Sequence, residues 1–330
     1  MIDASIPEVK FALHAVRQAC QIVQQVQSEL VGASLTKDDR SPVTVADFAS
    51  QALIARLLEE AFPDDPLVAE EDSAALRAAE GAPTLERVTG FVTRFSNGCS
   101  PERVCSWIDR GAAVPAGRYW VLDPIDGTKG FLRGEQYAVA LALVTGGQVQ
   151  LGVLGCPNLS DAYRPDPGGP GSLVLARRGE GTWATSLDAP WDFERLQVSR
   201  REDPAEARLL RSVESGHTNV SQIDEFAHSL GVQADPVGMD SQAKYAVLAA
   251  GKGDLLLRLL SASKPNYREK IWDQAAGSLV VEEAGGKITD LDGRPLDFTA
   301  GRTLANNRGI LASNGRLHSA ALQALQAIAA

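Results

Sequence analysis

The run Trp120-Val-Leu-Asp-Pro-Ile-Asp-Gly-Thr128 constrains the fold and chemistry of this chain more than any other segment. Its apolar start predicts a short buried strand over residues 119–122, and two aspartates follow at the C-terminal end of that strand. Asp123 and Asp126 are three residues apart, with a free carbonyl group between them. This set of oxygen atoms suits a hard cation such as Mg²⁺.

The residues after Asp126 indicate a binding site for an anion. Gly127 lets the backbone approach a ligand closely, and the N–H groups of Gly127 and Thr128 could face a phosphate at a helix start. The alternative is a plain surface turn, because Asp-Pro and Asp-Gly are common turn dipeptides. The apolar strand that leads into the segment argues against that turn. A phosphatase of the haloacid dehalogenase type is a poor fit, since it needs two aspartates two residues apart.

The composition limits the partners that the chain can have. A length of 330 residues predicts two lobes, and 44 % apolar with 22 % charged residues is ordinary for a globular protein. The net charge is −10, and no basic run is present that would follow a nucleic-acid backbone. A phosphorylated small molecule still fits an acidic protein if metal ions reverse the local field.

The cysteines and the N-terminus favour a cytoplasmic protein. Cys20, Cys99, Cys105 and Cys156 are scattered, with no C-x-x-C pair, which argues against zinc and against a disulfide framework. The chain opens on acidic and polar residues rather than on a signal peptide. No stretch of 18 apolar residues occurs, so we expect no membrane segment.

Hydrophobic periodicity predicts two N-terminal helices. A capping box at Ser5–Glu8 introduces the first helix, which runs to about Leu30, and the second begins near Thr44 and ends before Pro63. Residues 72–117 contain helical stretches with Gly and Pro breaks, a pattern that fits a cap or lid.

Short strands dominate the middle of the chain, and an α/β pattern follows. We place the change of lobe near residue 157, before a loop rich in proline and glycine, so that the lobes comprise residues 1–157 and 158–330. In the second lobe short strands alternate with helical patterns, which favours an α/β arrangement. The predicted strands are 67–69, 119–122, 137–144, 149–154, 173–176, 209–213 and 255–259, and the later helices are 222–230, 241–250 and 273–284.

Three further carboxylate segments stand at the ends of predicted elements. Glu70-Glu71-Asp72 follows a strand, but an acidic loop tip is usually only a solvated surface. Asp47 could simply be a negative charge near a helix N-terminus. Asp273, in Trp272-Asp-Gln-Ala-Ala-Gly277, could be an N-cap residue. Four such segments in one chain are harder to explain as turns and caps alone.

Together these segments resemble the inositol monophosphatase superfamily of lithium-sensitive, magnesium-dependent phosphatases, and within it the 3'(2'),5'-bisphosphate nucleotidases. The superfamily motifs are the segment 123–128, Glu70-Glu71 and Trp272-Asp273 with the helix end at Gly285-Gly286. The motifs that resemble the nucleotidases are Ser41–Asp47, Lys129–Arg133, Val213–His217, Asp240–Tyr245 and Arg268–Asp273. The resemblance implies an α/β fold: a layered α-β-α-β-α sandwich of the inositol monophosphatase and fructose-1,6-bisphosphatase type.

The resemblance also implies a set of site residues. Glu70, Asp123, Asp126, Asp273 and the Ile125 carbonyl would hold two or three Mg²⁺ ions. Asp47 and Thr128 would orient and deprotonate the attacking water. The nucleotide contacts correspond to His217, Ser241, Lys244 and Arg258, although the segment 260–267 is a residue or two longer than the family pattern.

Three of the nucleotide contacts have a plainer alternative. Lys244 could pair with Asp240 on a helix surface, Ser241 could cap that helix, and His217 could be an ordinary loop residue. The shared context Asp240-Ser-Gln-Ala-Lys-Tyr245 favours the site.

The implied activity is hydrolysis of the 3'-phosphate of adenosine 3',5'-bisphosphate, and of 3'-phosphoadenylyl sulfate, by a cytoplasmic monomer. An inositol monophosphatase or inositol polyphosphate 1-phosphatase with the same metal chemistry is the first alternative. A sensor that binds metal or nucleotide without turnover is the second, and an intact Asp47–Thr128 pair argues against it.

Overall fold

The strands of the central sheet alternate their side chains between two apolar cores. In β2 (Arg118–Asp126) the side chains of Trp120 and Leu122 belong to one core, and those of Tyr119 and Val121 belong to the other. Since both faces of this sheet are apolar, both must be covered by helices. The structure is a computed structural model that describes residues 2–31, 41–189, 192–212, 220–260 and 266–328.

The first sheet has seven strands in the order β1-β2-β3-β4-β7-β8-β9. β1 pairs with β2 in parallel, and every later neighbour pairs antiparallel. A separate two-stranded ribbon is formed by β5 and β6. The bounds are β1 Leu67–Ala69, β3 Ala138–Thr145, β4 Gln148–Cys156, β5 Leu159–Ser160, β6 Arg164–Pro165, β7 Ser172–Arg177, β8 Gly181–Ser186 and β9 Glu194–Leu196.

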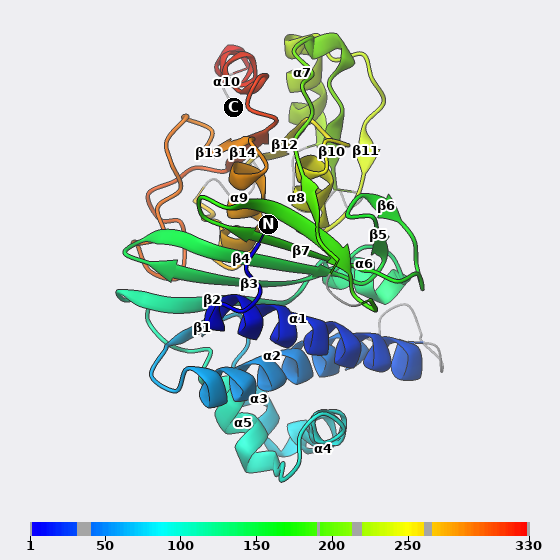
Figure 1. The fold of residues 1–330 in the computed structure, drawn as a ribbon, viewed down its shortest axis with the longest axis vertical. Helices are drawn as coiled ribbons and strands as arrows, with labels where there is room; N and C mark the ends of the chain where they lie inside the picture. The colour runs from blue at the N-terminus through cyan, green and yellow to red at the C-terminus, as the bar shows by residue number, and fades with distance from the viewer. Residues whose placement is uncertain (1, 32–40, 190–191, 213–219, 261–265, 329–330) are drawn as a thin grey trace.

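Helices cover both faces of this sheet (Figure 1). On one face lie α1 (Pro7–Val26), which continues as the π-helical turn Gln27–Val31, and α2 (Ser41–Ala61). On the other face lie α8 and α9. Shorter helices pack on the far side of α2. The bounds are α8 Ala243–Ala249, α9 Ala275–Glu283, α3 Ala74–Arg77, the 3₁₀ turn Ala79–Gly81, α4 Ala82–Thr93 and α5 Pro101–Asp109.

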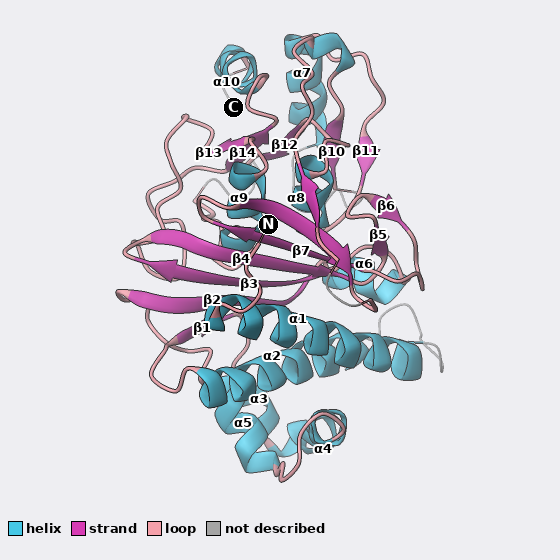
Figure 2. Ribbon diagram, in the orientation of Figure 1, coloured by secondary structure: helices cyan, strands magenta, loops and turns pink. Residues whose placement is uncertain are grey.

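A second sheet lies beyond α8 and α9, in the order β11-β10-β12-β14-β13. In β12, Leu256 packs toward α8 and α9, and Leu255 and Leu257 pack toward α7 and α10. Figures 1 and 2 show the resulting layers, which confirm the predicted α-β-α-β-α sandwich. The bounds are β10 Leu209–Arg211, β11 Val237–Gly238, β12 Leu255–Arg258, β13 Lys287–Thr289, β14 Ile310–Ser313, the 3₁₀ turn Pro204–Glu206, α6 Thr128–Arg133, α7 Val220–Leu230 and α10 His318–Ala327.

Strand β4 carries a glycine on each face, which lets a helix approach closely on both sides. A Cβ atom at Gly155 would overlap the Cys20 sulfur of α1, and one at Gly152 would lie 2.7 Å from the Ala276 carbonyl oxygen of α9. Any larger residue would push one of these layers away. The spacing of the layers therefore depends on two small residues in one strand.

Several local predictions at the N-terminal end are wrong. Helix α1 begins at Pro7 with Ile6 as its N-cap, and Ser5 donates to Asp3 (Oγ to Oδ1, 2.6 Å) instead of capping the helix. Proline is well suited to the first helical position, so the helix needs no capping box there. Helix α2 begins at Ser41 rather than near Thr44.

Residues 72–117 do not form a lid. Helices α3, α4 and α5 pack behind α2, on the side away from the sheet (Figure 1). Their apolar residues, including Val88, Phe91 and Trp107, are buried in the same core as α2.

The first sheet also extends further along the chain than predicted. Strand β7, predicted to lie in the second lobe, pairs with β4 along its whole length. The change from one sheet to the other occurs between Leu196 and Leu209, so a lobe boundary at residue 157 would cut through the first sheet. The proline- and glycine-rich loop therefore connects two strands of one sheet. In the described part of the chain, no helix is long and apolar enough to cross a membrane.

The close approach of α1 to β4 predicts opposite effects for two Gly→Ala substitutions. Gly155→Ala should lower the free energy of unfolding by about 1–3 kcal/mol, because the methyl group has no room against Cys20 and Val16. Gly90→Ala, in the exposed middle of α4 with no atom within 4 Å, should raise it by about 0.5–1 kcal/mol. Urea denaturation measures both. Equal effects would contradict the packing described here.

Candidate active site

Two acidic residues are brought together by the register of the first sheet. Ala69 of β1 pairs with Leu122 of β2, and Glu70 and Asp123 are the next residues on each strand. Because the two strands are parallel, both side chains are delivered to the same edge. The acidic segment after β1 is thus part of a pocket rather than only a solvated loop tip.

The irregular end of β2, from Asp123 to Asp126, is held by contacts from two other layers. The Pro124 carbonyl accepts a hydrogen bond from Ser50 of α2 (3.1 Å from Oγ), and Asp126 accepts one from the backbone N–H of Gln242 (2.6 Å). Gly127 has φ +90°, and a Cβ atom there would lie 2.8 Å from the Cβ atom of Ser241. Glycine is therefore required at 127 for both its conformation and its lack of a side chain.

The third acidic segment comes from the layer on the opposite side. Gln242 donates from Nε2 to the Trp272 carbonyl (3.0 Å) and accepts from the Gly277 N–H (3.3 Å). Gln242 therefore connects Asp126, at the end of β2, to the segment that carries Asp273. The N-cap of α9 is Gln274, so the N-cap interpretation of Asp273 is wrong.

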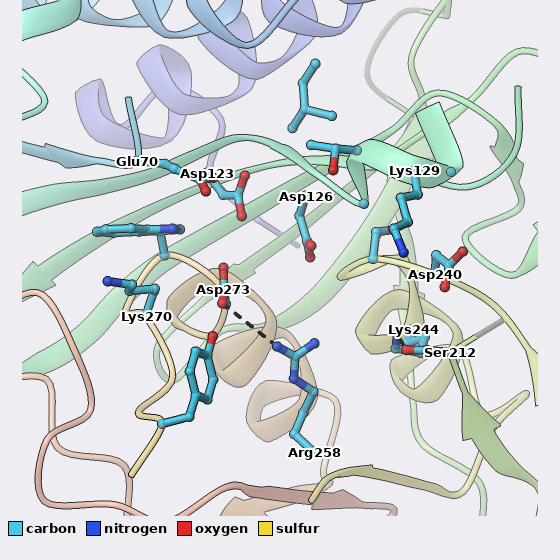
Figure 3. Close-up of a pocket in the computed structure, with 17 residues that line it drawn as sticks. Glu70, Asp123, Asp126, Lys129, Ser212, Asp240, Lys244, Arg258, Lys270 and Asp273 are labelled. Atoms are coloured by element: carbon cyan, nitrogen blue, oxygen red, sulfur yellow. Dashed lines mark hydrogen bonds and ion pairs between the residues drawn. The ribbon is translucent and has the colours of Figure 1, made fainter. Parts of the chain in front are cut away.

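These segments enclose a cavity of about 290 Å³. Figure 3 shows the carboxylates of Glu70, Asp123, Asp126 and Asp273 facing one another across it. Most of the predicted site residues line this cavity. The lining residues are Glu70, Asp123, Ile125, Asp126, Gly127, Thr128, Lys129, Gly130, Ser212, Asp240, Ser241, Lys244, Arg258, Tyr267, Lys270, Trp272 and Asp273.

Burial and the neighbouring carboxylates make ionisation of the acidic side chains in this cavity less favourable. Burial, and after it the charge of Asp126, raises the pKa of Asp123 well above its ordinary value. The pKa of Asp273 is also raised, by burial first, although the Arg258 cation opposes the rise. Glu70 is exposed as a whole, but desolvation of its carboxyl group and the neighbouring Glu71 raise its pKa to about 7. A cation in the cavity would relieve all of these repulsions.

The donor set fits a hard metal ion. The Asp123 Oδ1 atom is buried and has no hydrogen-bond partner among the described residues, which is costly unless a cation or water meets it. Carboxylate and carbonyl oxygens are the ligands that Mg²⁺ and Ca²⁺ prefer. No three Asp, Glu, His or Cys side chains in the described residues already stand close enough to hold one ion, so binding would draw the carboxylates inward.

Asp47 is buried and does not line the cavity. Its Oδ1 atom also has no hydrogen-bond partner among the described residues, and burial, then Glu71 and Glu70, raises its pKa well above the ordinary value. Asp47 is the seventh residue of α2, beyond the first turn, where the helix dipole acts. The interpretation as a helix N-terminal charge is therefore wrong. Thr128 is exposed in the cavity at the start of α6.

The opposite wall of the cavity is basic. Lys244 is buried and donates from Nζ to Ser212 Oγ (3.0 Å); burial, and then the nearby Arg258, lower its pKa to about 8. Arg258 binds Glu269 (3.0 Å) and lies 3.9 Å from Asp273. Asp240 is held by Arg133 (2.6 Å). Lys244 is therefore not a surface residue paired with Asp240, and that alternative is wrong.

Ser241 adopts a left-handed conformation with φ +65°, which is costly for a residue other than glycine. Its Oγ accepts a hydrogen bond from the Ala243 N–H (3.2 Å), and Gln242 is the N-cap of α8. Strained backbone of this kind is common at ligand sites. His217 lies outside the described residues.

Two glutamines that hold the acidic segments were missed in the sequence. Besides Gln242, the buried Gln51 of α2 accepts from the Glu71 N–H (3.0 Å) and donates to the Glu71 carbonyl (2.7 Å). Each is a single polar residue in a helical or loop pattern, and nothing in the sequence marks its partner. Lys129, Ser212, Asp240, Tyr267, Lys270 and Trp272 also line the cavity without having been predicted as site residues.

Several curated proteins of similar sequence are named as 3'(2'),5'-bisphosphate nucleotidases. A 3'(2'),5'-bisphosphate nucleotidase of Schizosaccharomyces pombe is 41 % identical over 341 residues, covering 97 % of this chain and 95 % of that protein. A protein of Oryza sativa with the same name is 43 % identical over 338 residues, covering 97 % of this chain and 93 % of that protein.

Solved structures with a similar fold are more distant in sequence. An IMPase from Thermotoga maritima superposes with a TM-score of 0.62 at 20 % identity, covering 98 % of each chain. CysQ from Bacteroides thetaiotaomicron, described as a bacterial member of the inositol monophosphatase family, gives 0.61 at 19 % identity and covers 93 % of this chain and 97 % of that one. At these identities the likeness establishes the fold.

The family model described as "Inositol monophosphatase family" matches residues 6–330. That match spans both sheets and every segment that borders the cavity. The chain belongs to the inositol monophosphatase family.

Proposed function

We propose that this chain is a magnesium-dependent phosphatase that hydrolyses the 3'-phosphate of adenosine 3',5'-bisphosphate to give AMP and phosphate. One observation carries the proposal: a single cavity has four carboxylates on one side, the acidic wall, and Lys244 and Arg258 across from them, the basic wall. Lys270, beside Glu70 and Asp273, and Asp240, beside Lys129, are the exceptions to this division. The acidic wall suits metal ions at the phosphate that is cleaved. The basic wall, with Lys244 and Arg258, suits a second anionic group on the same substrate.

The comparisons support this choice of substrate. The curated relatives named above as 3'(2'),5'-bisphosphate nucleotidases match nearly the full length of the chain. The family as a whole is metal-dependent. We further propose 3'-phosphoadenylyl sulfate as a second substrate, because its 5' side also carries an anion. A cytoplasmic role in sulfur metabolism and inhibition by lithium would follow from the same assignment.

The acidic wall provides the metal ligands in this proposal. Glu70, Asp123, Asp126, Asp273 and the Ile125 carbonyl would hold two or three Mg²⁺ ions. Bound Mg²⁺ neutralises the charge of a phosphate monoester and lowers the pKa of a bound water molecule. The protein itself contributes position and charge, because this reaction needs little covalent chemistry from side chains.

Asp47 and Thr128 orient and deprotonate the attacking water: the Thr128 hydroxyl group accepts the proton of the water and passes its own proton to Asp47, which does not line the cavity. The Thr128 side chain is exposed in the cavity, so its hydroxyl group can accept a hydrogen bond from that water. Asp47 has a buried oxygen without a partner and a raised pKa, both of which suit a group that accepts a proton.

The nucleotide occupies the opposite side. With a pKa of about 8, Lys244 remains mostly protonated at pH 7 and can bind the 5'-phosphate together with Arg258 and Ser241. The N–H groups of Gly127 and Thr128 face the 3'-phosphate. His217, outside the described residues, stays a predicted nucleotide contact.

Substrate selectivity tests the proposal directly. Purified protein with Mg²⁺ should release phosphate from adenosine 3',5'-bisphosphate and 3'-phosphoadenylyl sulfate much faster than from inositol 1-phosphate, inositol 1,4-bisphosphate or fructose 1,6-bisphosphate. EDTA should abolish the release, and Asp273→Asn should lower kcat by more than about 100-fold through loss of a metal ligand.

The matched control is Asp235→Asn, which removes an exposed carboxylate outside the cavity and should leave kcat unchanged. Release from inositol phosphates alone would replace the nucleotide assignment with an inositol phosphatase. Calorimetric binding of the nucleotide without any turnover would instead indicate a sensor.

The role of Lys244 predicts a dependence on the second phosphate. Lys244→Met should raise KM for adenosine 3',5'-bisphosphate about 10- to 100-fold, because a hydrogen bond to a charged group contributes about 1.5–3 kcal/mol. The same variant should change KM for 3'-AMP by less than about threefold, since that substrate lacks the 5'-phosphate. Lys252→Met, an exposed lysine just after α8, is the control. Equal losses on both substrates would contradict the assignment.

A further inference from the structure

Two of the acidic segments are joined by one arginine that does not line the cavity. Arg302 lies in the connection between β13 and β14. Its guanidinium group donates to the carbonyl oxygens of Ala69, Gly111 (2.8 Å) and Ala113 (3.3 Å). It also lies over the Trp272 ring, 4.9 Å from the ring centroid. Ala69 immediately precedes Glu70, and Trp272 immediately precedes Asp273.

The backbone of Arg302 is fixed beside the second of these segments. Its carbonyl accepts a hydrogen bond from the Ile271 N–H (3.2 Å), and Thr303 forms an isolated antiparallel bridge with Lys270. The side chain therefore starts from the Asp273 segment and reaches across to the Glu70 segment.

The far end of this contact is the outer strand of the first sheet. The Ala69 N–H donates to the Gly111 carbonyl (2.9 Å), and the Ala113 N–H donates to the Leu67 carbonyl (3.3 Å). The Arg302 guanidinium binds carbonyls on both of these paired segments, so it fixes the end of β1 from which Glu70 projects.

The contact made by Arg302 matters because the carboxylates of Glu70 and Asp273 belong to different layers. Glu70 and Asp123 are related by strand register, but Asp273 precedes α9, on the other side of the cavity. Like charges on the two sides repel, and nothing in the sheet itself opposes their separation. Gln242 holds the Trp272 carbonyl, and Arg302 holds the Trp272 ring.

We propose that Arg302 is a positioning residue that sets the distance between Glu70 and Asp273 and thereby the affinity of the acidic wall for divalent metal ions. The role rests on the metal site of the proposed function and adds a determinant that does not touch the metal or the substrate. A planar guanidinium is needed, because it stacks on an indole and donates to several carbonyl oxygens at once.

The test is metal affinity measured in two ways. Arg302→Met and Arg302→Lys should each raise the Mg²⁺ concentration for half-maximal phosphate release about 10- to 100-fold, the usual effect of losing a residue that orients metal ligands. Calorimetric titration of the full chain with Mn²⁺ should show a matching loss of affinity without any substrate. The KM for the nucleotide at saturating Mg²⁺ should stay within about twofold.

The matched control is Arg178→Met. Arg178 also joins the first sheet to α9, because it donates to the Val149 carbonyl (2.7 Å) and to Glu282 (3.0 Å). These contacts lie at the start of β4 and at the end of α9, far from the Asp273 segment that precedes α9. The Arg178→Met variant should need the same Mg²⁺ concentration for half-maximal phosphate release as the wild type. If Arg302→Met fails to fold, the lysine variant, which keeps the charge and length, decides the question.

The outcomes separate this role from the proposed function. The positioning role would be overturned if Arg302→Lys needed the same Mg²⁺ concentration for half-maximal release as the wild type. It would also be overturned if Arg178→Met raised that concentration as much as the Arg302 variants do. Absence of Mg²⁺ and Mn²⁺ binding to the wild-type chain would overturn it together with the metal assignment. Metal binding that depends on Arg302, without turnover of the nucleotide, would support the role and refute the proposed substrate.

Discussion

The desolvation of four carboxylates in one cavity, to which their mutual repulsion adds, is the constraint on which the rest of the site depends. Burial raises the pKa values of Asp123, Asp126 and Asp273, so ionising them in the folded chain costs free energy. The cost applies at neutral pH, which lies above the pKa of these groups in an unfolded chain. Part of it is offset by Arg258 and Lys244 on the facing wall. The remainder is available as binding free energy for a cation.

The layered fold makes this arrangement possible. Parallel pairing of β1 with β2 sets Glu70 beside Asp123, and the packing of α9 on β4 brings Asp273 in from the opposite layer. Gly152 of β4 lets α9 approach the first sheet closely, and Gln242 and Arg302 bridge the sheet and the segment before α9. A small change in layer spacing would therefore alter the metal site even though no ligand is touched.

Sequence reasoning recovered what is local. The strand that ends in Asp123 and Asp126, the helix that contains Asp47 and the strand before Glu70 are visible in hydrophobic periodicity, because each depends on neighbouring residues. The layered sandwich followed from a resemblance to a family rather than from the pattern itself. The same resemblance placed Ser241, Lys244 and Arg258, which line the cavity.

Long-range contacts account for what was missed. Strand β7 joins the first sheet by pairing with β4 across an irregular loop, and a loop rich in proline and glycine gives no sign of which sheet follows it. Gln51, Gln242 and Arg302 act through partners up to 233 residues away in the sequence. The cap or lid suggested for residues 72–117 is wrong for the same reason, since the apolar residues of this segment pack on α2, which is distant in the sequence from part of them.

Thermal unfolding with and without Mg²⁺ tests the central claim most directly. The claim is that the buried carboxylates destabilise the folded chain and that a bound metal ion removes this destabilisation. The wild-type Tm should rise with Mg²⁺, because a ligand at 100 times its Kd stabilises by about 2.7 kcal/mol. Asp123→Asn should unfold at a higher temperature than the wild type in EDTA and gain much less from Mg²⁺. A wild-type Tm that does not respond to Mg²⁺, or a lower Tm for Asp123→Asn in EDTA, would contradict the account.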